Sequence, residues 1–259
     1  MSIVFIGDIH QMWDTVAAGL AALRHPPKAA ILLGDIQCER PLDRLAAPLL
    51  DRGIDVHWIF GNHDNDGGPA MWANLTDPAA NPRTAPGALN GRVQIIQGLR
   101  IAGLGGIFRP RVWQPPDPPR LHRRTDLRAD LAETGAGWPQ SHVTALHHSL
   151  TSAAIWPEDY DRLATQTADI LVTHEAPSSH PAGNPALDVL ARKMGARLIV
   201  HGHHHITYKA TAADGLAAIG IAAAWGTTPD GTVLWTGERP RPMPALPAGW
   251  SLEGTAHTR

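Results

Sequence analysis

Short apolar runs alternate with polar, glycine-containing segments along most of this chain. Runs of this length bounded by glycine are typical of buried parallel strands. Five of them lie at residues 3–6, 29–33, 56–60, 170–173 and 198–200. Between the early runs, apolar residues recur at helical spacing, first as Trp13, Val16 and Leu20 and then as Leu42, Leu45 and Leu49. Two successive strand–helix units predict a parallel sheet with right-handed crossovers.

The middle of the chain is less regular. It predicts a short helix near residues 71–74, adjoining strands at 93–96 and 100–104, and a charged helix over 125–133. His147 and His148 precede a Ser-Leu-Thr-Ser segment that we expect to be a loop. Long irregular insertions often serve as lids or binding loops, so we expect a cap at about residues 66–150.

Regular structure returns in the last third of the chain. Helices are expected over residues 158–164 and 186–194, the second framed by Asn184-Pro185 at its start and by Gly195 at its end. Residues 206–236 alternate short strands with glycine turns. We therefore expect a single domain over residues 1–239. A proline-rich tail at 240–259 should be disordered or lie on the surface as a strap.

The composition is that of a globular protein without a disulfide or a membrane span. With 259 residues, of which 43% are hydrophobic, the chain can bury a sizeable core. A net charge of −2 predicts no general attraction to nucleic acid or anionic membranes. Cys38 is the sole cysteine, so an internal disulfide is excluded. No apolar stretch approaches the roughly 20 residues of a membrane span, and no signal peptide precedes the first strand, so we expect a cytoplasmic protein.

The residues that follow the five apolar runs are of types that bind metals. They are Asp8-x-His10, Gly34-Asp35, Gly61-Asn62-His63-Asp64, His174 and Gly202-His203-x-His205. In open α/β sheets the loops at the carboxyl ends of the strands build the site, so we expect these side chains at one edge of one sheet. Oxygen and imidazole ligands suit borderline divalent ions. The sequence therefore predicts a metal centre, and one that holds two ions.

This ordered set resembles the motifs of the calcineurin-like metallophosphoesterase superfamily. All five motifs occur in order over residues 7–205. The resemblance implies an α/β fold that is a four-layer α/β/β/α sandwich of two mixed sheets flanked by helices. It implies that Asp8, His10 and His205 bind the first ion, that Asn62, His174 and His203 bind the second, and that Asp35 bridges both. It also places His63, held by Asp64, at the phosphate as the catalytic pair.

The activity that the resemblance implies is hydrolysis of phosphate mono- or diesters by a hydroxide activated by two divalent metal ions. Mn²⁺ is the preferred cofactor, and Fe, Zn, Co or Ni ions also suit the ligands. Paired ions lower the pKa of a bridging water and clamp the attacking and leaving oxygens. His63 is placed to donate a proton to the leaving oxygen or to stabilise the transition state.

The substrate stays open at this point. A phosphorylated small molecule or a nucleotide is expected, and a phosphatase, a phosphodiesterase or a nucleotide pyrophosphohydrolase would each fit. A nuclease is disfavoured, because the net charge is slightly negative and no broad basic stripe is present. A non-enzymatic alternative is a partner-binding scaffold on the same fold, but such proteins tend to lose ligands that this chain retains. The sequence predicts no particular oligomeric state.

Two further features depart from the motifs. Cys38 stands where purple acid phosphatases have a tyrosinate ligand, and where Ser/Thr protein phosphatases have an Asp followed by Arg-Gly. It is either an oxidation-sensitive thiol near the second ion or an ordinary loop cysteine. The stretch from Arg109 to Arg128 holds six arginines. We interpret it as a solvated loop, with a grip on a phosphate chain as the alternative.

Overall fold

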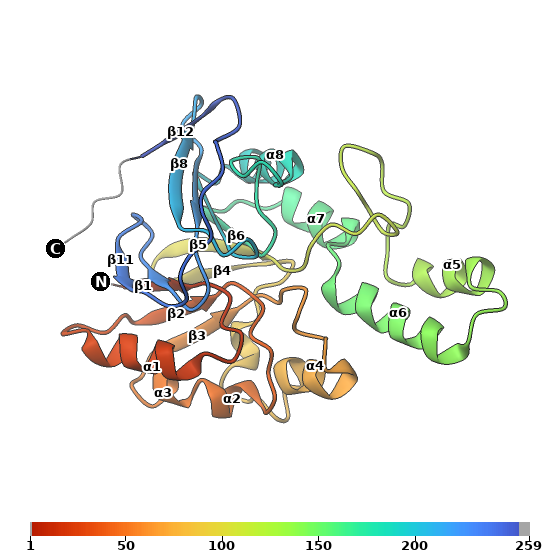
Figure 1. Ribbon diagram of the computed structural model, residues 1–259, viewed down its shortest axis with the longest axis horizontal. Coiled ribbons are helices and arrows are strands. Elements are labelled where there is room, and N and C mark those ends of the chain that lie inside the picture. The colour runs from red at the N-terminus through yellow and green to blue at the C-terminus, as the bar shows by residue number, and fades with distance from the viewer. Residues whose placement is uncertain (1, 254–259) are drawn as a thin grey trace.

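Two sheets lie face to face at the centre of the computed structural model, which describes residues 2–253 (Figure 1). The first sheet contains β1 (Ile3–Ile6), β2 (Ala29–Leu32), β3 (Asp55–Trp58), β10 (Gly226–Thr227) and β11 (Val233–Trp235), in the order β11-β10-β1-β2-β3. The second contains β4 (Arg92–Ile96), β5 (Leu99–Leu104), β6 (Ile170–Thr173), β7 (Leu198–His201), β8 (Tyr208–Ala212), β9 (Ala217–Gly220) and β12 (Trp250–Leu252), in the order β12-β8-β9-β7-β6-β5-β4.

Both sheets are mixed, and each has a parallel centre. Strands β1, β2 and β3 pair in parallel, as do β5, β6, β7 and β9, and the outer strands pair antiparallel. Alternate residues of β1 enter different layers: Ile3 and Phe5 pack between the sheets, and Val4 and Ile6 pack against helices. Burial on both faces explains why these strands are continuous apolar runs.

Helices cover the outer face of each sheet. The first sheet is covered by α1 (Trp13–Ala22), α2 (Leu42–Leu45) and α3 (Ala47–Leu50), and the second by α7 (Pro157–Ala164) and α8 (Pro185–Met194). Helix α8 begins and ends as predicted, because the Asn184 side chain accepts a hydrogen bond from the N–H of Ala186 and Gly195 adopts a φ of 72°. The four-layer sandwich is thereby confirmed.

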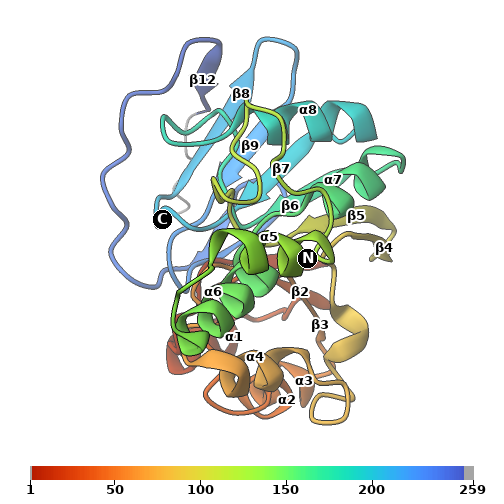
Figure 2. The ribbon, with the colours of Figure 1, turned by 90° about the vertical axis from the view of Figure 1, so that its right-hand side faces the viewer.

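The range of residues 66–150, which we expected to form a cap, contributes both to the sandwich and to a projecting part. This range contains α4 (Gly68–Thr76) and the 3-10 turn η1 (Ala85–Gly87), but also β4 and β5, which belong to the second sheet. The part that projects from the sandwich consists of α5 (Asp126–Thr134), α6 (Gln140–Ala153) and the loops around them (Figures 1 and 2). The Ser-Leu-Thr-Ser segment expected as a loop is the C-terminal turn of α6.

The described part of the C-terminal tail is a strap and not a disordered segment. Met243, Leu246 and Trp250 pack against an apolar cluster on β8, and β12 pairs antiparallel with that strand. We call residues 237–249 the C-terminal strap. Residues 254–259 of the predicted tail lie outside the described range. Within residues 2–253, none of the helices has the length and apolar character needed to cross a bilayer.

Candidate metal centre

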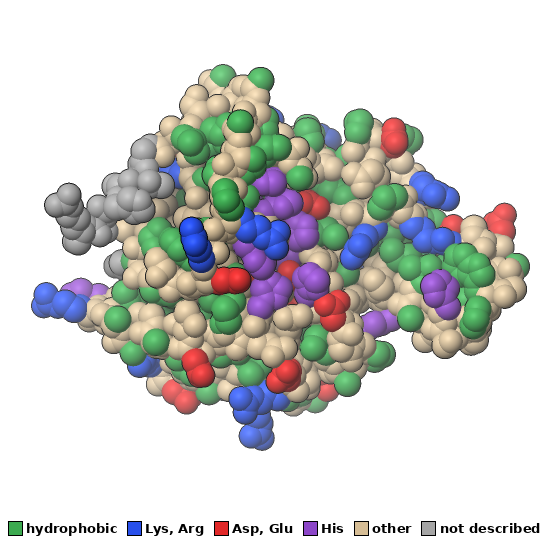
Figure 3. Space-filling view, viewed as in Figure 1, with side chains coloured by type: hydrophobic (Ala, Val, Ile, Leu, Met, Phe, Trp, Pro, Cys, Tyr) green, Lys and Arg blue, Asp and Glu red, His purple; other side chains and the backbone are tan. Residues whose placement is uncertain are grey.

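The predicted metal ligands come together where the two sheets face each other. Asp8, Asp35 and Asn62 follow strands of the first sheet, and His174 and His203 follow strands of the second. The expectation that one edge of one sheet carries them all is therefore wrong. In the space-filling view, histidine side chains gather in the middle of the face that spans both sheets (Figure 3).

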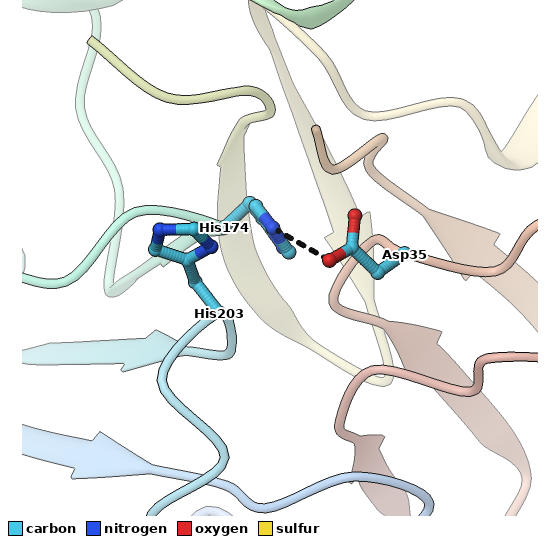
Figure 4. A group of neighbouring side chains, drawn as sticks. All are labelled: Asp35, His174 and His203. Atoms are coloured by element: carbon cyan, nitrogen blue, oxygen red, sulfur yellow. Dashed lines mark ion pairs between the residues drawn. The ribbon is translucent and has the colours of Figure 1, made fainter. Parts of the chain in front are cut away.

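One group of ligands surrounds His174, which is fully buried. Its Nε2 atom lies 3.3 Å from Asp35 Oδ2 and 3.0 Å from Asn62 Oδ1. Its Nδ1 atom lies 2.8 Å from the carbonyl oxygen of Leu33 and 3.5 Å from Asp8 Oδ1, so Nε2 is the nitrogen that faces Asp35 and Asn62. Asp35, His174 and His203 offer ligand atoms within 4.8 Å of one another (Figure 4).

A second group adjoins the first. The Nε2 atoms of His10 and His205 lie 3.1 Å apart, and His205 Nε2 lies 3.6 Å from Asp8 Oδ2. His10 Nε2 is also 3.8 Å from Asp35 Oδ2, so the Asp35 carboxylate stands between the two groups. Gln37 Oε1 lies 3.0 Å from His10 Nδ1 and fixes the ring, as partners of metal-binding histidines commonly do.

The backbone around the ligands is strained and crowded. His10, Asp35, His203 and His205 have φ values of 42°, 47°, 69° and 54°, in the left-handed region that non-glycine residues rarely adopt. Strain of this kind persists where the surrounding structure enforces it, and it clusters at functional sites. Gly202 is equally constrained, because a Cβ atom there would lie 2.3 Å from Asp8 Oδ1.

The buried carboxylates of Asp8 and Asp35 favour a positive charge beside them. Burial, opposed by His174 and reinforced by Asp35, raises the pKa of Asp8 to about 8. Burial acts in the same direction on Asp35, but the charge and hydrogen bond of His174 outweigh it and lower the pKa of Asp35. Within residues 2–253, Asp8 Oδ1 is buried without a hydrogen-bond partner. This oxygen lies 3.5 Å from His174 Nδ1, and coordination of a metal would satisfy it.

Two of the imidazoles are in the neutral form that binds metals. Burial lowers the pKa of His203 to about 3 and, together with the charges of His10 and Arg241, lowers the pKa of His205 to about 4. Both rings are therefore neutral at pH 7, as coordination requires. Burial also tends to lower the pKa of His174, but Asp35 and Asp8 raise it to about 10, so a bound cation would replace its proton. The residues present fit a divalent metal.

The expected contact between His63 and Asp64 is not formed. The Asp64 carboxylate is buried and accepts hydrogen bonds of 2.7 Å from the backbone N–H groups of Gly61 and Gln37. It therefore joins the two loops that carry Asn62 and Asp35. His63 Nδ1 instead lies 2.6 Å from Asp66 Oδ2, a partner that the sequence analysis missed. No spacing rule marks Asp66, because the pairing depends on the turn that follows the motif.

Further residues lie behind the ligands. Glu175 Oε1 is 3.7 Å from His204 Nε2, and the His204 ring stacks on His180 with centroids 3.9 Å apart. His201 is buried, and its Nε2 atom is 2.7 Å from the hydroxyl of Tyr208. Only the unusual density of histidine around Gly202 marks this region in the sequence.

Cys38 and two of the six arginines make contacts within the folded chain. Cys38 is buried in the apolar layer under α2, and burial followed by the charge of Asp64 raises its thiol pKa, which makes it unreactive. In the arginine-rich stretch, Arg124 pairs with Glu158 at 2.7 Å and Arg111 pairs with Asp130 at 3.0 Å. Both guanidinium groups are thus held by carboxylates of neighbouring elements.

Comparison with known proteins decides the family. Residues 1–207 match the sequence model of the calcineurin-like phosphoesterases. The chain belongs to this family. An uncharacterized protein of Haemophilus influenzae is 36% identical over 215 residues, which are 80% of this chain and 85% of that protein. As a member of the family, this phosphoesterase is a metal-dependent hydrolase of phosphate esters that uses divalent ions.

Solved structures share the fold of this phosphoesterase at low sequence identity. The protein TT1561 of Thermus thermophilus superposes with a TM-score of 0.53 at 11% identity, covering 87% of this chain and 92% of that one. A dimetal phosphatase from Danio rerio gives a TM-score of 0.50 at 13% identity, covering 88% and 89%. The predicted sandwich of two mixed sheets is thus confirmed by structural likeness as well as by the elements themselves.

Proposed function

We propose that this phosphoesterase holds two divalent ions, with Mn²⁺ as the preferred metal, and hydrolyses a phosphorylated small molecule or nucleotide. One observation carries the proposal: the Asp35 carboxylate stands between two groups of ligands. On one side its Oδ2 atom is 3.8 Å from His10 Nε2, and on the other it is 3.3 Å from His174 Nε2. We assign Asp8, His10 and His205 to one ion, Asn62, His174 and His203 to the other, and Asp35 to both.

The side chains of the site divide the work. A bound pair of divalent ions supplies an activated water and neutralises negative charge on the phosphate oxygens. The negative charges of Asp8 and Asp35 would neutralise part of the positive charge of the ions. The small positive net charge that is left favours binding of a phosphate anion. His63 is about half exposed beside this centre, with its ring 5.7 Å from that of His10. Since Asp66 holds its Nδ1 atom, His63 presents Nε2 to donate a proton to the leaving oxygen.

The test compares ligand variants with a matched surface variant. Asp35→Asn and Asn62→Ala should lose bound metal and lower the turnover of p-nitrophenyl phosphate and bis(p-nitrophenyl) phosphate by more than about 100-fold, because each removes stabilisation worth several kcal/mol. Asp14→Asn on the exposed face of α1 is the control and should change neither quantity. Metal content by mass spectrometry and steady-state kinetics give the readouts.

Two results would contradict this proposal. Wild-type turnover in folded Asp35→Asn protein would show that Asp35 does not bridge the reactive centre. Binding of a single equivalent of metal by the fully active wild-type enzyme would show that the site is mononuclear.

A further inference from the structure

The C-terminal strap lies against the loops that carry the metal ligands, although it falls outside the residues that match the family. The N–H of Glu238 donates to the carbonyl oxygen of Ala223 at 3.0 Å, and Trp225 Nε1 donates to the carbonyl oxygen of Glu238 at 2.7 Å. Three residues later, the N–H of Arg241 donates to the carbonyl oxygen of His205 at 2.8 Å. The strap is thereby fixed directly beside a metal ligand.

Two charged side chains of the strap border the site. Glu238 Oε2 lies 3.9 Å from His205 Nδ1, on the side of the ring away from Asp8. Arg241 is exposed and forms no ion pair with any residue in the range 2–253, and its positive charge acts on His205. Figure 3 shows basic side chains directly beside the histidines at the centre of the face.

Among the residues that the structure describes, Arg241 lacks a carboxylate partner, whereas Arg124 and Arg111 each have at least one. Arg124 is held by Glu158 and Asp159 at 2.7 and 2.6 Å, and Arg111 is held by Asp130 at 3.0 Å. A guanidinium without such a partner can donate its fork of N–H groups to the oxygens of a planar or tetrahedral anion. Arg241 is therefore a cation that is available to a ligand of the metal centre.

We propose that Arg241 is a substrate-binding residue that contacts a second negative charge next to the scissile phosphorus. The proposal rests on the proposed function and deepens it, because it selects substrates whose phosphate carries two charges or stands beside another phosphate. A phosphomonoester or a pyrophosphate has this second charge, whereas a simple diester has only one. The enzyme should accordingly favour monoesters or pyrophosphates over diesters.

The experiment uses the full-length, metal-loaded enzyme and its Arg241→Ala and Arg241→Lys variants. Arg239→Ala is the control, because Arg239 is an exposed arginine two residues earlier on the same strap. Substrates are p-nitrophenyl phosphate, bis(p-nitrophenyl) phosphate and inorganic pyrophosphate. Binding of inorganic phosphate is measured separately by calorimetry, and metal content by mass spectrometry.

For Arg241→Ala we expect kcat/KM for p-nitrophenyl phosphate to fall by about 10–100-fold, mainly through KM, as loss of one charge-assisted contact predicts. The diester should change by less than about threefold, since it lacks the second charge. Phosphate binding should weaken to the same degree as monoester binding, and metal content should stay the same. Arg241→Lys should recover part of the loss, and Arg239→Ala should behave as wild type.

A larger loss with pyrophosphate than with the monoester would support the proposal and identify a neighbouring phosphate as the second charge. A larger loss with the monoester would also support it and identify the second charge as that of the monoester dianion. Equal losses for monoester and diester, or loss of metal, would overturn it in favour of a structural role. If the wild-type enzyme hydrolysed none of the three substrates, the proposed function would fail, while the calorimetric comparison would still decide whether Arg241 binds phosphate.

Discussion

Gly61 offers a sharp test of how tightly the metal site is built. A Cβ atom at this position would lie 2.1 Å from Asp35 Oδ1, 2.5 Å from the backbone nitrogen of Asp35 and 2.6 Å from His174 Cε1. Ordinary contact begins near 3.4 Å. Two of these neighbours are ring or backbone atoms of other loops, so neither can turn away as a flexible side chain would. In Gly61→Ala, Asp35 and His174 must therefore separate from the Gly61 loop.

The size of the effect follows from this geometry. Relief of the clash requires a displacement of roughly 1 Å, and a misplacement of that size at a reacting centre costs on the order of 100-fold in turnover. Overpacking of a rigid interior costs a further 1–3 kcal/mol or so of unfolding free energy. We expect Gly61→Ala to fold, to bind metal weakly and to lose about 100-fold or more in kcat.

The assays are urea unfolding, metal titration and turnover of p-nitrophenyl phosphate. Gly53→Ala is the matched control: a Cβ atom there meets nothing within 4 Å, but φ is 71°. It should lose about 1 kcal/mol of stability through backbone strain and keep full activity. Gly61→Ala with wild-type metal affinity and turnover would show that the ligand loops adapt freely, and would refute the reasoning.

The remaining predictions concern Asp64 and Asp66, which follow His63, and the proton on His174. Asp64→Asn should lower the unfolding free energy by about 1–3 kcal/mol, measured in urea, because one buried N–H loses its acceptor. Asp66→Asn should leave stability nearly unchanged but slow the hydrolysis of esters with poor leaving groups, because the partner of His63 loses its negative charge. The third prediction concerns pH. Since the pKa of His174 is raised to about 10, its ring is protonated at pH 7 in the metal-free protein, and a bound metal must displace that proton. Mn²⁺ affinity should therefore rise as pH increases from about 6 to 9, with proton release visible by calorimetry in buffers of different ionisation enthalpy; affinity independent of pH would contradict this.

That Asp8, Asp35, Asn62 and His174 would lie near one another could be predicted from the sequence because each lies one or two residues after an apolar run. The end of a strand fixes where the next one or two side chains lie. The positions of Asp8 and His174 can therefore be predicted without knowing the rest of the fold. The sheet to which each strand belongs is a different matter. Buried runs look alike in both sheets, and pattern alone placed five strands in one sheet where the structure uses two.

Side-chain partners within the loops could not be predicted. Asp64 and Asp66 are two residues apart but have different partners. Asp64 accepts from the backbone of Gly61 and Gln37, whereas Asp66 contacts His63, and both pairings depend on the local turn. Helix α6 was missed for a related reason: its buried residues, Leu150, Ser152 and Ala153, are clustered at one end, so most of the helix lacks an apolar period. The hydrogen bond that ties it to the loop after His63, from Asn65 Nδ2 to Ser152 Oγ at 2.6 Å, could not be predicted from the sequence either.

The division of the ligands between two sheets has a consequence for biosynthesis. Asp8, Asp35 and Asn62 leave the ribosome early, whereas His174, His203 and His205 emerge more than a hundred residues later. The nascent amino-terminal half thus offers an incomplete cage, and stable coordination must wait until the carboxy-terminal half docks onto it. We therefore expect ion capture to be a late step of maturation, after the two halves have docked.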